Sequence, residues 1–137
     1  MNKLTVLILS CLSVACTKGY DPDYYFNELQ VVNLSGTTIE NVSASVAGTA
    51  KKISCEKVAK NDICHDYFGK RMLPQQGIEL SWIHGDGGQK SEVKSPRIPA
   101  FFSPAFPLRV MLEINEAGSV KAYFEQEEPG DRGTLYF

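Results

Sequence analysis

A small group of residues carries the side-chain types that do chemistry in proteins. Cys64, His65 and Asp66 are consecutive, and cysteine, histidine and a carboxylate work together in nucleophilic catalysis. Neighbours on a strand point to opposite faces, however, so Cys64 and His65 would not meet as a nucleophile and its base. A metal site made of Cys55, Cys64, His65 and His84 is the alternative, but the spacing is not a standard zinc-ligand spacing. We therefore predict no catalytic residue and no metal ligand.

The glycine-rich segment 85–88 superficially resembles a phosphate-binding loop. It lacks the lysine and the Ser/Thr of a P-loop, and no helical pattern follows it, so a hairpin turn is predicted instead. No GxSxG or HExxH motif and no paired-carboxylate motif stands out. The sequence therefore predicts neither an enzyme nor a cofactor.

The N-terminal segment has the composition of a signal peptide. Lys3 supplies one positive charge, and residues 4–14 are apolar, uncharged and shorter than the roughly 20 residues that span a bilayer. The segment ends in Leu-Ser-Val-Ala-Cys, at Cys16. These five residues resemble the lipobox of bacterial lipoproteins, although Ser13 stands where leucine is commoner. In that family a peptidase cuts before the cysteine, which is acylated on its thiol and on its new amino group.

This resemblance implies a signal peptide over 1–15, a lipidated tether over 16–25 and a domain over 26–137. The membrane would be held through the lipid on Cys16. Thr17 occupies the position where many Gram-negative lipoproteins carry an inner-membrane retention aspartate, so the family rule implies the outer membrane in such a host. Two alternatives stay open: acylation at Cys11, which would leave an apolar core shorter than about 7 residues, and an ordinary secretory signal.

The remaining cysteines are then accounted for together. With Cys11 removed and Cys16 acylated, Cys55 and Cys64 are an even pair in an oxidising compartment. We predict one disulfide between them, which explains both thiols better than a metal does.

Length and charge bound the mature chain. Removing residues 1–15 from the 137 leaves 122, enough for one domain with its own core. Lys3 leaves with the signal, so 13 basic and 16 acidic side chains remain. Because nucleic-acid binders normally carry a marked basic excess, we expect no nucleic-acid partner.

Alternation of apolar and polar residues runs through the domain, and no amphipathic helix of ordinary length appears. Strands are expected near residues 26–34, 42–46, 50–55, 78–84, 89–94, 108–114 and 120–124, with a last edge strand at 134–137. About seven or eight short strands predict an all-β chain folded as an antiparallel β-sandwich, immunoglobulin-like or transthyretin-like. Trp82 is the expected core aromatic.

The segment 95–107 contains four prolines and cannot be a helix or a central strand. Its three rings, Phe101, Phe102 and Phe106, would either plug one end of the sandwich or contact a partner. Arg97 and Arg109 would then lie at the rim of the contact and form hydrogen bonds.

A small sandwich without a catalytic motif is more often a binding module than an enzyme, so we expect a non-catalytic periplasmic protein-binding lipoprotein. In size, anchor and fold it resembles immunity proteins that neutralise periplasmic toxins. It also resembles accessory subunits of envelope machines, such as the outer-membrane lipoprotein of type VI secretion. A small-ligand binder that uses the face of Trp82 and His84 together with the phenylalanine loop is the alternative, and an enzyme without a recognisable motif is third.

Overall fold

The computed structural model describes residues 24–46, 52–72 and 77–126. The expected signal peptide over 1–15, Cys16, most of the expected tether and the expected strand at 134–137 lie outside these residues. The described chain is all β, and within it no helix is long and apolar enough to cross a membrane. Its strands are β1 (Tyr25–Leu34), β2 (Ile39–Val46), β3 (Lys52–Val58), β4 (Ile63–Met72), β5 (Ile78–Ile83), β6 (Gln89–Lys94), β7 (Leu108–Asn115) and β8 (Val120–Gln126).

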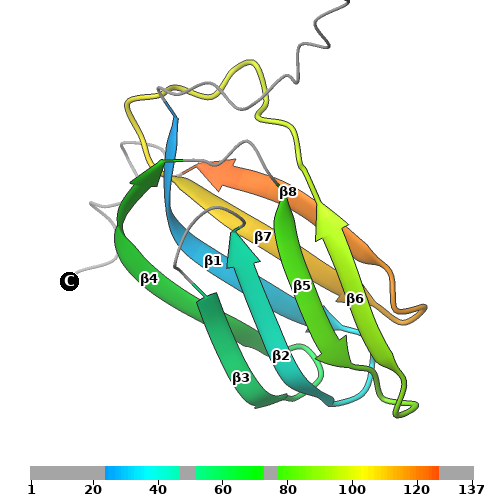
Figure 1. Cartoon of the computed structure of the whole chain (residues 1–137). Coiled ribbons are helices and arrows are strands. Elements are labelled where there is room, and N and C mark those ends of the chain that lie inside the picture. Colours follow the sequence, from blue (N-terminus) through cyan, green and yellow to red (C-terminus); the bar gives the residue numbers. More distant parts are fainter. Residues whose placement is uncertain (1–23, 47–51, 73–76, 127–137) are drawn as a thin grey trace, which may run out of the picture.

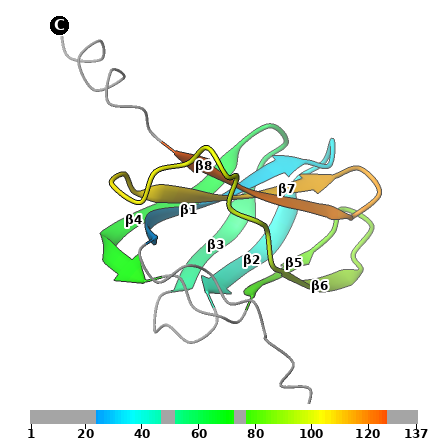
Figure 2. The ribbon, with the colours of Figure 1, turned by 90° about the horizontal axis from the view of Figure 1, so that it is seen from above.

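Two four-stranded sheets pack face to face, as the sequence predicted. Sheet A has the order β4-β1-β7-β8 and sheet B the order β3-β2-β5-β6, and Figure 2 shows them as two layers. Every neighbouring pair is antiparallel except β1 and β7, which run parallel. An immunoglobulin domain pairs its first strand with its second, whereas β1 here pairs with β4 and β7, so the strand order differs from the immunoglobulin order.

Strand β4 occupies a stretch for which the sequence predicted no strand. Alternation is hard to see there because, of the described side chains from Ile63 to Tyr67, only that of Cys64 is buried. Pairing with β1 over most of its length holds β4 at the edge of sheet A. The strand is therefore defined by its partner rather than by its own hydrophobic pattern.

The core lies between the sheets and is made by the inward residues of both. Trp82 is its largest fully buried side chain, 1% exposed, as expected from its strand. A bulge in β1 between Phe26 and Glu28 shifts the alternation, so that Leu29 faces inward while Glu28 lies on the outer face of sheet A.

The two ends of the sandwich differ. We call the end where β1 and β7 begin the tether end, and the opposite end, where tight connections join β1 to β2 and β7 to β8, the turn end (Figure 1). At the turn end the buried Asn33 donates from Nδ2 to the carbonyls of Thr37 (2.7 Å) and Val58 (2.9 Å). The tether end carries the connection from β6 to β7.

Candidate binding surfaces

The predicted disulfide is present and closes one side of the sandwich. Cys55 of β3 and Cys64 of β4 are bonded, with Cα atoms 6.0 Å apart. These are the edge strands of sheet B and sheet A, so the bond links the two layers. Cys64 is buried while His65 is exposed on the outer face, where its ring contacts Tyr67 edge-on at 5.6 Å. The consecutive Cys and His thus point apart, as strand geometry requires.

Trp82 and His84 use their polar atoms on each other and on the backbone. The Trp82 indole N–H donates to His84 Nδ1 at 3.3 Å, and His84 Nε2 lies 3.2 Å from the carbonyl oxygen of Glu116. An indole can only donate, so Nδ1 accepts and the ring proton is on Nε2, which donates to Glu116. These contacts of Trp82 and His84 lie at the turn end, whereas the loop over 95–107 lies at the tether end (Figure 1). The two groups therefore form no common ligand site.

The phenylalanines of the 95–107 segment have different environments. Phe101 is 84% exposed, whereas Phe102 is half-buried and packs against the core. Their rings meet edge-on at 5.0 Å. The Tyr24 hydroxyl donates to the Phe102 carbonyl at 2.7 Å, which ties the loop to the start of β1. The two roles expected for these rings are thus divided between neighbours.

Gln126, at the end of β8, holds the other side of this loop. Its Oε1 accepts from the Ser103 N–H at 2.9 Å, and its Nε2 donates to the carbonyls of Ser103 (2.6 Å) and Phe106 (3.0 Å). Phe106 is half-buried, and Arg97 is exposed where the loop begins. Residues 98–107 include no charged side chain. The loop is consequently an apolar segment fastened at both sides.

Arg109, which the sequence predicted at the rim of a partner contact, lies on the outer face of sheet A. Its Nε is 2.6 Å from Glu28 Oε2 and its Nη1 is 3.2 Å from Glu125 Oε2. Burial alone would lower the pKa of Arg109, but the hydrogen bonds and charges of Glu28 and Glu125 outweigh it and raise the pKa. The guanidinium links three adjacent strands.

The outward side chains of sheet A form a grid of rows across its four strands, and the sequence alone did not predict which residues share a row. Its rows are Tyr67–Glu28–Arg109–Glu125, His65–Gln30–Met111–Tyr123 and Ile63–Val32–Glu113–Lys121. Tyr67 is 60% exposed and Ile63 is 40% exposed. Alternation in β7 and β8 was a usable signal for the residues those strands contribute, but the β4 residues carry no such signal. The face combines tyrosine, arginine, methionine and aliphatic side chains.

Tyr123 is fixed within this grid. Its hydroxyl donates to Glu113 Oε1 at 2.6 Å, and Lys121 Nζ lies 5.2 Å from the centre of its ring. Burial, the hydrogen bond to Glu113 and the negative charges of Glu113 and Glu125 raise the pKa of Tyr123 to about 12. The phenol is neutral at physiological pH and serves as a donor.

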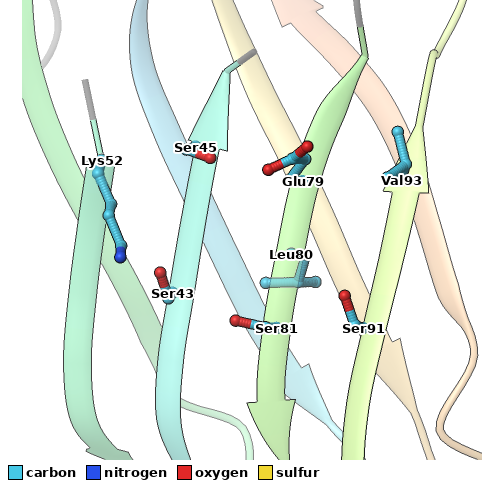
Figure 3. Close-up of a pocket in the computed structure, with 8 residues that line it drawn as sticks. All are labelled: Ser43, Ser45, Lys52, Glu79, Leu80, Ser81, Ser91 and Val93. Carbon is cyan, nitrogen blue, oxygen red and sulfur yellow. The ribbon is translucent and has the colours of Figure 1, made fainter. Parts of the chain in front are cut away.

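The outer face of sheet B is different in chemistry. It carries a hollow of about 320 Å³, and Figure 3 shows serine side chains from three strands along it. The lining residues are Ser43, Ser45, Lys52, Glu79, Leu80, Ser81, Ser91 and Val93. It is open and mainly polar, unlike the enclosed apolar pockets that hold small ligands. Among the described residues no three His, Cys, Asp or Glu side chains gather as a metal site.

Comparisons with known families, curated proteins and solved structures give a similarity in fold alone. No family model matches the chain, and no curated protein matches it. A solved structure, the NMR structure of a protein from Eubacterium rectale, is similar at a TM-score of 0.48 and 12% identity. The match covers 80% of this chain and 97% of that one.

Proposed function

We propose that the chain is a non-catalytic, lipid-anchored periplasmic module that binds another protein of the cell envelope. One observation carries the proposal: the exposed aromatic side chains lie on open outer surfaces rather than around an enclosed pocket. Tyr67, which is 60% exposed, is such a side chain on the outer face of sheet A. Open aromatic surfaces suit a protein partner, whereas a small ligand needs an enclosed, largely apolar site.

The protein contact that the geometry favours is the outer face of sheet A. Tyrosine, methionine and arginine are enriched in protein interfaces, and Tyr67, Met111 and Arg109 lie in adjacent rows of this grid. The ion pairs of Arg109 hold its guanidinium in place before a partner arrives, and a hydrogen bond to Glu113 holds Tyr123 of the same face. Pre-ordered side chains lose less conformational entropy on binding. Arg109 also belongs to the partner-binding residues that the sequence predicted. It is therefore common to that set and to the outer face of sheet A.

Tyr67→Ala tests this contact, and Val93→Ala is the matched control. Val93 is also an exposed strand residue, but it lies on the outer face of sheet B. The mature lipidated protein should retrieve a partner from envelope extracts, the Val93 variant should retrieve it equally, and the Tyr67 variant should lose it. Equal recovery by both variants would remove the outer face of sheet A from consideration. The partner's own identity, a toxin or a subunit of an envelope machine, decides between the two classes the chain resembles.

The anchor is tested separately from the contact. Labelled palmitate should enter the wild type and the Cys11→Ser variant but not the Cys16→Ser variant. Three acyl chains would hold the domain stably, because one chain alone gives only marginal binding. Labelling of the Cys16→Ser variant at the wild-type level would show that another residue carries the lipid, and Cys11 would be the next residue to test.

A further inference from the structure

We propose that the apolar loop, residues 98–107, rests on the lipid surface that holds the protein, with the Phe101 side chain in the membrane interface. The inference rests on the lipid anchor of the proposed function and adds a second, non-covalent contact with the same bilayer. It gives the loop a partner other than the protein partner expected from the sequence.

The chemistry of the loop's exposed surface suits lipid. Its exposed residues are Ala100, Phe101, Pro104 and Ala105, and none of their side chains carries a polar group. A protein contact typically includes about one hydrogen bond per 100–200 Å² of interface, which these side chains cannot supply. Phenylalanine is among the side chains that interfacial segments bury at the boundary between headgroups and acyl chains. The exposed Arg97 beside the loop would meet anionic headgroups.

The position of the loop brings it to the membrane. The Tyr24 hydroxyl donates a hydrogen bond to the Phe102 carbonyl. Tyr24 follows Cys16 by eight residues in the sequence. Eight residues reach at most about 28 Å when fully extended. The ten residues of β1 add about 33 Å between the tether end and the turn end. A lipid on Cys16 therefore keeps the tether end, with the loop across it (Figures 1 and 2), within about 28 Å of the bilayer.

The loop is also ordered before contact. Gln126 makes three hydrogen bonds to it, and Phe102 anchors it on the core. Four prolines in 95–107 limit the conformations of the free segment. Because the anchor already confines the chain to the surface, insertion of Phe101 gains from a high local lipid concentration. The loop would thereby set which face of the domain points along the membrane, and would leave the outer face of sheet A open to a partner.

Quenching by brominated lipid tests the contact directly. Mature lipidated protein carrying Phe101→Trp is reconstituted into phosphatidylethanolamine–phosphatidylglycerol vesicles containing brominated phosphatidylcholine. Leu34→Trp is the matched control, because Leu34 is 43% exposed but lies at the turn end. Native Trp82, buried in the core, is the internal reference. We expect at least a twofold loss of the emission contributed by the tryptophan at 101, and none from Leu34→Trp or from Trp82.

The outcomes separate this inference from the anchor. If the protein incorporates palmitate but the tryptophan at 101 is quenched no more than the one at 34, the loop does not rest on lipid and the anchor stands. If palmitate is not incorporated at Cys16, the anchor fails instead. Quenching of the unacylated Cys16→Ser, Phe101→Trp chain by added vesicles would then still support the lipid contact of the loop, and its absence would overturn it.

Discussion

Arg109 Nε lies 2.6 Å from the carboxylate of Glu28, a side chain whose residue is only 1% exposed although it faces outward from sheet A. The two residues are partners in the parallel register of β1 and β7. The β1 bulge places Glu28 on this face, and Gln30 Nε2 donates to its second oxygen. A buried carboxylate thus depends on one guanidinium.

Replacing Arg109 by alanine should destabilise the fold strongly. Glu28 would be left as a buried charge without its cation, a change that costs about 3–5 kcal/mol. Glu125→Ala removes only the more exposed partner of the same guanidinium and should cost less than about 1 kcal/mol. Urea unfolding of both variants measures the difference. A free energy of unfolding for Arg109→Ala within 1 kcal/mol of the wild type would show that Glu28 does not need the pair.

Truncation should destabilise the fold at Phe102 but hardly at Phe101. Phe102→Ala removes a half-buried ring that packs against the core and should lower the free energy of unfolding by about 2–3 kcal/mol, less than for a fully buried phenylalanine. Phe101→Ala removes an exposed ring and should change it by less than about 0.5 kcal/mol. Thermal melting followed by circular dichroism distinguishes them. Equal destabilisation would mean that Phe101 also supports the packing of the loop.

Reduction of the Cys55–Cys64 bond should weaken the domain without abolishing the fold. The bond closes a loop of about ten residues, for which the chain-entropy model gives roughly 2–3 kcal/mol. Melting with and without reductant measures the loss, and the Cys55→Ser, Cys64→Ser double variant, which should be insensitive to reductant, is the control. Two freely alkylated thiols in protein purified from the periplasm would contradict the bond.

Tyr123 should make the fold less stable at alkaline pH. Its pKa is raised to about 12 in the folded state, against about 10 in an unfolded chain. Below pH 10 both states keep the proton and the contribution is complete. Between about pH 10 and 12 the unfolded state releases its proton first, so stability falls as pH rises. For a partly exposed group the loss should be about 1 kcal/mol.

Tyr123→Phe isolates that contribution. The variant should lose less stability than the wild type between pH 9 and 11.5 in urea unfolding, and absorbance at 295 nm should show one fewer late-titrating phenol. Parallel pH profiles for the two proteins would rule out Tyr123 as the source.

The sequence by itself determined the class of the fold and the position and buried faces of its strongest strands. Alternation marked β5 and β7 because one face of each is buried throughout, and it placed Trp82 in the core. Cysteine arithmetic paired Cys55 with Cys64, since the compartment implied by the lipobox favours oxidation. The alternation is visible in the sequence because it depends only on which side of a strand each residue occupies.

The tertiary structure alone decided what crosses between distant strands. The parallel pairing of β1 with β7 brings Glu28 to Arg109, 81 residues apart, and no local pattern specifies which strands become neighbours. Strand β4 was missed because only its partner β1 defines it. The different roles of Phe101 and Phe102 depend on Tyr24 and Gln126. Tyr24 reaches the loop from the start of β1, and Gln126 reaches it from the end of β8. Sheet order and register, set by the packing of the whole core, therefore decide which side chains form a surface.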